Sequence, residues 1–230
     1  MILKRHRTSK RHFVPETTDV RGVETRRCLL SAGLRLFGRH GHEGVSTRAL
    51  AREAGVNLAA IPYHFGSKDG TYLAVARQIV SMIGAEFLQA TEEINSRFGQ
   101  VKSNKPELVE LLIALMTSMI RSVCLSPDRV SIGLFIMREQ IQPTEAFDIL
   151  YTGFMAPVSA TYSQLVGALR DLHPDDSRVG IEVQMVLGQV FIFCTGRHAL
   201  LRRLRWKELD EEHLQEIVHV LGGVVRRQFA

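Results

Sequence analysis

The sequence lacks the features that mark a disulfide-bonded, metal-binding or catalytic protein. Its three cysteines, Cys28, Cys124 and Cys194, are an odd and scattered set that gives no disulfide framework. The nine histidines form no HExxH or other ligand spacing, so we expect no metal site and no cofactor. G-x-S-x-G and phosphate-cradling glycine loops are also missing, which argues against an enzyme.

Long uninterrupted hydrophobic runs are missing too. The N-terminal stretch MILKRHRTSKRHF is charged where a signal peptide needs an apolar run. The most apolar stretch, residues 179–201, is interrupted by Glu182, Gln184, Gln189 and Arg197, which disfavours a membrane span. We therefore expect a cytoplasmic protein that has no membrane association.

Positive charge is concentrated near the N-terminus. Residues 1–15 hold five lysines and arginines and no acidic residue, and residues 21–70 hold eight against four. Residues 71–230 hold sixteen against eighteen and are close to neutral. Because the net charge of +5 arises in the first 70 residues, this part is expected to bind a polyanion.

Apolar residues recur at helical spacing from residue 22 onward, and no stretch alternates convincingly like a strand. Ser46 is placed to cap a short helix that Gly55 ends, and Asn57 is placed to cap the next one. Ser67 is placed to cap a long helix that follows. Two short helices joined by a tight glycine turn and braced by longer helices form a helix-turn-helix.

The sequence as a whole predicts an all-α protein with two domains. A flexible basic arm is expected over residues 1–20 and a three-helix helix-turn-helix DNA-binding domain over residues 21–70. Its connecting helix should run to about residue 98. A larger α-helical domain for effector binding and dimerisation is expected over residues 99–230.

Two adjacent segments, LRLFGRHGHEGVSTRALAREAGV and YHFGSKDGTYLAV, stand out within residues 24–80. Together they resemble the DNA-binding domain of the TetR family of bacterial transcription regulators. The rest of the chain resembles that family only in its layout of about five helices. The resemblance implies a homodimer, a short palindromic operator of double-stranded DNA and, usually, repression relieved by a small ligand.

Candidate phosphate contacts surround the glycine turn. Thr47 and Arg48 lie in the first turn of one helix, and Lys68 lies at the start of another, where the helix dipole favours an anion. Tyr63 and His64 could direct a hydroxyl and an imidazole N–H at phosphate oxygens. Alternatively, these two side chains only cap and pack.

Side chains that could read bases are few. Leu58, Ala59 and Ala60 can touch thymine methyl groups, and only Asn57 can read a hydrogen-bond pattern, unless capping occupies it. Pro62 departs from the aromatic or polar residue typical of the family. Proline costs roughly 3 kcal/mol in an ordinary helix interior, but Pro62 lies just past the first turn, so we expect a bent or partly 3₁₀ helix and the loss of one hydrogen bond. The bend either shapes recognition or has no functional meaning.

The basic arm offers a second contribution to DNA binding. Arg5 and Arg7 could enter the minor groove, or the arm could be a generic solvated tail. If Arg5 and Arg7 do not contribute, discrimination between DNA sequences would depend on Thr47, Arg48, methyl contacts and DNA shape. The alternative function is a nonspecific, nucleoid-type DNA-binding protein that uses this arm.

The C-terminal helices predict a homodimer. The segment over residues 181–193 is apolar on nearly every side, and such a helix must be buried all round. The last helix carries a regular apolar stripe over residues 214–225. We therefore expect a homodimer formed through residues 175–203 and 210–228, the alternative being two core helices of a monomer.

Methionine and aromatic residues at helical spacing suggest an effector pocket, although such a stripe can also be plain core. The candidate lining residues are Met116, Met119, Phe135, Met137, Phe147, Tyr151, Phe154 and Met155. Gln140, Arg138 and His198 could add polar contacts. A small, largely apolar effector is expected.

Overall fold

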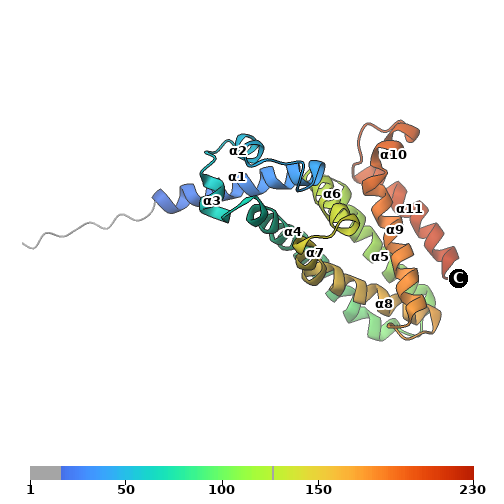
Figure 1. Ribbon diagram of the computed structural model, residues 1–230. Coiled ribbons are helices and arrows are strands. Elements are labelled where there is room, and N and C mark those ends of the chain that lie inside the picture. Colours follow the sequence, from blue (N-terminus) through green and yellow to red (C-terminus); the bar gives the residue numbers. More distant parts are fainter. Residues whose placement is uncertain (1–16, 126) are drawn as a thin grey trace, which may run out of the picture.

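The computed structural model describes residues 17–125 and 127–230, which contain helices and no strand (Figure 1). The all-α prediction is confirmed. The elements in chain order are α1 (Thr17–His40), α2 (Thr47–Ala54), α3 (Ala60–Phe65), α4 (Lys68–Val101), α5 (Lys105–Cys124), α6 (Pro127–Ile141), α7 (Glu145–Leu150), the π-helix η1 (Tyr151–Met155), α8 (Ala156–Arg170), α9 (Ser177–Thr195), α10 (Arg197–Leu204) and α11 (Glu211–Gln228).

Helix α1 begins earlier than the sequence pattern predicts. It starts at Thr17, so residues 17–20 of the expected flexible arm are helical. The rest of that arm, with Arg5 and Arg7, lies outside the described residues. Helices α1, α2 and α3 form the expected helix-turn-helix at one end of the molecule (Figure 1).

Helix α4 connects this end to the larger helical domain. Its buried side chains include Ile79, Ile83 and Phe87, and it packs against α1, α5, α7 and α8. Gly33 of α1 allows a close approach to α4, because a Cβ there would lie 2.8 Å from Cγ2 of Val75. Helix α4 therefore belongs to both parts of the chain, and the hydrophobic core runs through it without a break.

Helix α6 lies against α1, and this is the second connection between the two parts (Figure 1). Gly38 of α1 permits it, because an added Cβ would lie 2.6 Å from the carbonyl oxygen of Ser131. In the larger domain α5 is central and packs against α4, α6, α8, α9 and α11. A change in the position of α6 would therefore alter its contacts with α1 directly.

Candidate DNA-binding surface and ligand cavity

Helix α2 opens with a capped turn that carries Thr47 and Arg48. The hydroxyl oxygen of Ser46 accepts a hydrogen bond from the backbone N–H of Ala49 at 3.1 Å. Arg48 is exposed and Thr47 is half-buried. Because first-turn N–H groups point out of a helix start and the dipole is positive there, this turn can hold a phosphate.

The turn between α2 and α3 fixes Asn57. Gly55 ends α2 with a φ of 65°, a left-handed conformation that glycine adopts without steric penalty. The Oδ1 atom of Asn57 accepts a hydrogen bond from the Ala59 backbone N–H at 2.9 Å. The side-chain oxygen is thus used locally, and only the Nδ2 donors are left for a base edge.

The α-helical part of α3 starts at Ala60, later than an Asn57 cap predicts. Two tighter bonds precede it, from the Ala60 N–H to the Asn57 carbonyl at 3.0 Å and from the Ile61 N–H to the Leu58 carbonyl at 3.2 Å. Bonds between residues three apart are the 3₁₀ pattern. The expected 3₁₀ character is therefore present at the start of α3.

Pro62 lies in the first turn of α3, and its ring is exposed. In a regular helix, an N–H at this position would donate to the Leu58 carbonyl, which already accepts from Ile61. The expected loss of a hydrogen bond is therefore wrong, since α3 starts at Ala60 and proline is tolerated in a first helical turn.

Tyr63 and His64 form the outer end of α3. Tyr63 is 82% exposed, and its ring meets the ring of His64 edge to face with 4.8 Å between centroids. Phe65 is half-buried, and the Arg26 guanidinium lies 5.4 Å from its ring centroid. The Tyr63 hydroxyl is thus presented to solvent, beside a ring that restricts its movement.

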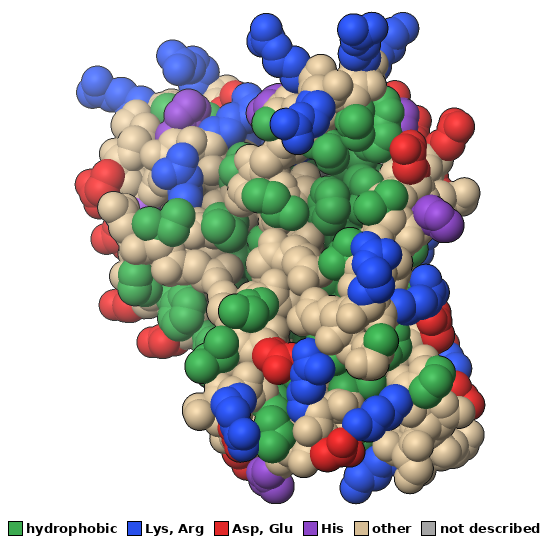
Figure 2. Space-filling model, turned by 90° about the vertical axis from the view of Figure 1, so that its right-hand side faces the viewer, with side chains coloured by type: hydrophobic (Ala, Val, Ile, Leu, Met, Phe, Trp, Pro, Cys, Tyr) green, Lys and Arg blue, Asp and Glu red, His purple; other side chains and the backbone are tan. Residues whose placement is uncertain are grey.

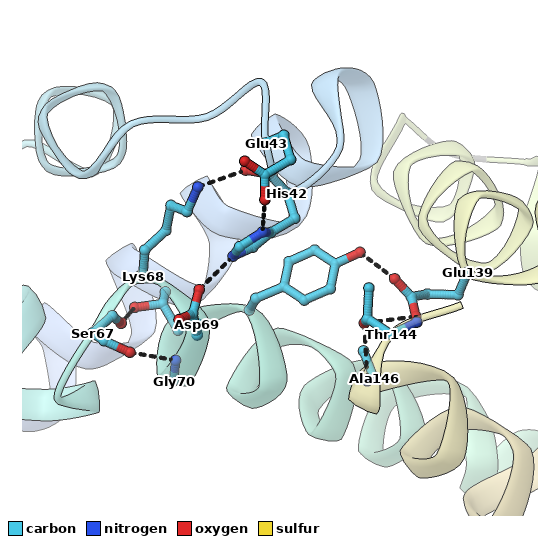
Figure 3. A network of polar contacts seen from close by, with 11 residues as sticks. His42, Glu43, Ser67, Lys68, Asp69, Gly70, Glu139, Thr144 and Ala146 are labelled. Atoms are coloured by element: carbon cyan, nitrogen blue, oxygen red, sulfur yellow. Dashed lines mark hydrogen bonds and ion pairs between the residues drawn. The ribbon is translucent and has the colours of Figure 1, made fainter. Parts of the chain in front are cut away.

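Lys68 at the start of α4 has a structural contact that the sequence did not indicate. Its Nζ atom donates to the His42 carbonyl oxygen at 3.1 Å, which ties α4 to the loop after α1 (Figure 3). Ser67 caps the same helix by accepting from the Gly70 N–H at 2.9 Å. An ammonium group has three donors, so a phosphate contact remains compatible with this bond.

His42 joins this corner to the interior. Its Nε2 atom lies 2.7 Å from Asp69 Oδ1 and its Nδ1 atom lies 3.0 Å from Glu43 Oε1 (Figure 3). Its ring packs edge to face against Tyr72 with 4.9 Å between centroids. The start of α4 is therefore held to the α1–α2 loop by polar and aromatic contacts together.

Glu139, at the end of α6, is a buried carboxylate held by neutral donors. It is 1% exposed and accepts from the Tyr72 hydroxyl at 2.5 Å (Figure 3). Its second oxygen accepts from the Thr144 N–H at 3.0 Å and the Thr144 hydroxyl at 2.9 Å. Burial raises the pKa of Tyr72 far above its ordinary value, and the bond to Glu139 adds to this, so the phenol stays protonated.

The residues on either side of Glu139 contact two different parts of the molecule. The Arg138 guanidinium donates to the carbonyls of Gly38 at 3.0 Å and Arg39 at 2.5 Å, at the end of α1. Arg138 is therefore not among the residues that line the cavity described next. Gln140 does line a cavity. Three consecutive residues of α6 thus contact α1, α4 and a cavity.

That cavity, called the apolar cavity below, has a volume of about 210 Å³. It is lined by Met119, Gln140, Phe147, Tyr151, Phe154, Met155, Val158, Ser159, Gln184, Leu187 and Phe191. The π-helix η1 contributes Tyr151, Phe154 and Met155. A π-helical turn is frequent at functional sites, because its extra residue changes the direction of neighbouring side chains.

Four of the other expected pocket residues lie elsewhere. Met116 is fully buried in the core, and Phe135 stacks on Tyr72 with 4.7 Å between centroids. Met137 and His198 do not line the cavity either, and His198 is exposed on α10. Spacing along one helix shows which side chains share a face, but not which of them reach a space between helices.

Sequence reasoning missed the contributions of α8 and α9 to the cavity. Val158 and Ser159 come from α8, and Gln184, Leu187 and Phe191 come from α9. The sequence pattern assigned α9 to the dimer interface or to the core, and not to a pocket. The polar Gln184 within its apolar run was the signal that could have pointed to a second role.

The outer surface of α9 and α11 is a further notable feature. Its exposed apolar residues, called the α9–α11 face below, are Ile181, Met185, Ile192, Val220 and Val224. Figure 2 shows hydrophobic side chains gathered on this side of the molecule. A groove of about 320 Å³ on it is lined mostly by apolar residues of α9, α10 and α11.

Helix α9 also has the length and composition of a membrane span. Its mean hydropathy is 1.3, and 28% of the hydrophobic window is buried within the chain. Apolar helices that are covered by protein share this length and composition, so the finding does not contradict the expectation from the sequence.

Comparison with known proteins gives matches over both parts of the chain. Residues 29–75 match the bacterial regulatory proteins of the tetR family, and residues 108–230 match the C-terminal domain of the HTH-type transcriptional dual regulator CecR. CecR of Shigella flexneri is 31% identical over 198 residues, which cover 86% of this chain and 88% of that protein. The regulatory protein RaaS of Mycobacterium tuberculosis is 34% identical over 99 residues, or 40% of this chain and 42% of that protein.

The solved structure of HlyIIR, a hemolysin II transcriptional regulator, has the same fold, with a TM-score of 0.54 and 16% identity. The match covers 86% of this chain and 97% of that one. The likeness extends through the helix-turn-helix and the larger helical domain. Since one family match spans more than half of the sequence and the Shigella flexneri relative aligns with most of it, the chain belongs to the TetR family of bacterial transcriptional regulators.

Proposed function

We propose that this regulator binds a palindromic operator as a homodimer, acts as a repressor, and is released from DNA by a small, largely apolar ligand. The observation that carries the proposal is the last turn of α6. There Arg138 contacts the end of α1, Glu139 contacts α4, and Gln140 lines the apolar cavity. One helical turn thus touches both the candidate ligand site and the helices that present the DNA-binding surface.

DNA contact is assigned to the surface of α2, α3 and the start of α4. Thr47, Arg48, Tyr63 and Lys68 would contact phosphates, with His64 in a supporting position, because these groups surround exposed helix starts. Base edges would meet Asn57, Leu58, Ala59, Ala60 and Pro62. Because most of these are apolar, specificity would depend on thymine methyl groups and on DNA shape.

Dimerisation is assigned to the α9–α11 face. Ile181 is 59% exposed and Val220 is 60% exposed, and large contiguous apolar patches usually mark interaction sites. Pairing two copies through this face is an isologous contact, as expected for a twofold dimer. Such pairing would also cover the apolar surface of α9.

Ligand release is assigned to a movement of α6. A ligand in the apolar cavity contacts Gln140, and the neighbouring Glu139 is bonded to Tyr72 of α4. Displacing this turn would also disturb the Arg138 bonds to α1. A ligand that binds more tightly to the displaced arrangement shifts the population away from the DNA-binding one.

The test is selection of genomic DNA fragments by the purified full-length protein in the presence of excess random DNA. We expect enrichment of a short palindrome whose half-sites are separated by the spacing of two α3 helices in a dimer. If excess random DNA instead abolished the binding of every genomic fragment, this result would support the nonspecific alternative. Because the Shigella flexneri relative is named a dual regulator, reporter assays at the selected promoters should score activation as well as repression.

A further inference from the structure

We propose that the apolar cavity binds a small uncharged aromatic ligand of one or two rings that carries a hydrogen-bonding group. The inference rests on the proposed role of this cavity as the effector site and specifies the chemistry of that effector.

The lining of the cavity offers no charged partner to a ligand. It contains no Asp, Glu, Lys, Arg or His, and its side-chain polar groups apart from the Tyr151 hydroxyl are those of Gln140, Ser159 and Gln184. Burying a carboxylate or an ammonium without a partner charge is strongly unfavourable. Amide and hydroxyl side chains both donate and accept, which suits a neutral carbonyl, amide or hydroxyl group.

The two charged residues that precede the lining residue Gln140 contact other parts of the molecule. Arg138 donates to the carbonyls at the end of α1, and Glu139 accepts from Tyr72 and Thr144. Neither is part of the cavity lining. A charged ligand that paired with Arg138 or Glu139 would therefore have to break these bonds.

The shape of the cavity selects a flat ring. Met119, Phe154 and Val158 are buried and form its floor. Phe147 and Tyr151, which also line it, stack on each other with 5.7 Å between centroids and an angle of 22°. Aromatic rings and thioethers make favourable contacts with a bound aromatic ring.

The volume limits the ligand to a small one. An apolar cavity of about 150 Å³ holds benzene, so about 210 Å³ holds one substituted ring or two fused rings. The wall formed by η1 has little room to retreat, because a Cβ on Gly153 would lie 2.7 Å from both γ-carbons of Val80 on α4. A long-chain ligand would exceed this volume.

Three probes of equal size test the charge requirement. Naphthalene-2-carboxamide is neutral, 2-naphthoate is an anion, and 2-naphthylmethylammonium is a cation. Binding to the full-length protein is measured by titration calorimetry and by the shift in melting temperature. We expect the amide to bind at least about tenfold more tightly than either ion. Tighter or equal binding of an ion, or no binding of any probe, would overturn the proposal.

A substitution at the rim provides the matched control. Gln184→Lys adds a cation at an exposed lining residue, and it should shift the preference toward 2-naphthoate. Gln164→Lys adds the same charge at an exposed position of α8 outside the cavity, and it should leave the order of the probes unchanged. The same change of preference in both variants would show that the ions bind elsewhere, against the proposal.

Failure of this inference is separable from failure of the proposed function. If the amide binds but does not weaken DNA binding, the ligand chemistry stands and the release mechanism fails. If a charged probe binds in the cavity and weakens DNA binding, the release mechanism stands and the ligand chemistry fails.

Discussion

The α2–α3 surface and the α9–α11 face both expose apolar side chains, but their surroundings differ. Leu58 and Tyr63 are exposed beside polar groups such as Arg48 and Asn57. Helices α9 and α11 instead expose several apolar side chains together, around a groove with few polar atoms. Scattered apolar groups suit a wet, charged partner, whereas a contiguous patch suits a surface covered by protein.

The largest effect is expected from a charge on the α9–α11 face. Ile192→Asp combined with Val220→Asp should give monomers, because a buried unpaired carboxylate opposes association. DNA binding should then weaken roughly 100-fold or more, since two linked half-site contacts become independent. Sedimentation and fluorescence anisotropy measure the two effects.

Leu88→Asp is the control for this variant. Leu88 is 45% exposed on α4, outside the face, so the variant should stay dimeric and bind DNA normally. Monomeric wild-type protein at micromolar concentration would contradict the different roles assigned to the two surfaces.

A second substitution tests the link between the two regions. Tyr72→Phe removes a buried donor to Glu139 and should lower the free energy of unfolding by about 1–3 kcal/mol. Tyr162→Phe is the matched control, because the equally buried Tyr162 hydroxyl donates only to the Met119 sulfur. Loss of the Tyr162 hydroxyl should lower the free energy of unfolding by less, since a thioether is a weak acceptor. Urea titration compares the two, and equal losses would argue against a special role for Glu139.

A third substitution tests the polar character of the candidate DNA-binding surface. Arg48→Ala should weaken binding to all duplexes alike and reduce the slope of log affinity against log salt by about one per subunit. Arg77→Ala, at an exposed position of α4, should change neither quantity. A loss confined to the operator would instead make Arg48 a base-reading residue.

The smallest effect is expected at Pro62. Because proline there lies in a first turn and restricts the unfolded chain, Pro62→Ala should lower stability by about 0.4–1 kcal/mol. The sequence pattern alone predicted the opposite sign, from a lost helical bond. Thermal unfolding decides between the two, and fragment selection shows whether the exposed ring affects site preference.

Local features of the fold were predictable because their causes are local. Ser46 and Ser67 cap helices as their positions indicated, and Gly55 is left-handed. A cap involves residues two or three apart, so a short stretch of sequence contains all of its partners. The all-α class followed from such signals together with helical periodicity.

The link between the regions was not predictable, because its partners are far apart in sequence. Tyr72 and Glu139 are separated by 67 positions, and the bond from Arg138 to Gly38 spans 100. Similarly, the cavity combines α5, the end of α6, α7, η1, α8 and α9, and no single helix indicates it. Only the folded arrangement shows that Arg138 faces α1 whereas Gln140 faces the cavity.

The most direct test of the account measures DNA affinity with and without a cavity ligand in wild-type protein and in Tyr72→Phe. With naphthalene-2-carboxamide, wild-type affinity for a selected operator should fall by about tenfold. Tyr72→Phe should bind the same ligand equally well yet lose much less DNA affinity, because the bond from α4 to Glu139 is absent. An equal response of both proteins would contradict the claim that the last turn of α6 transmits ligand binding to the DNA-binding helices.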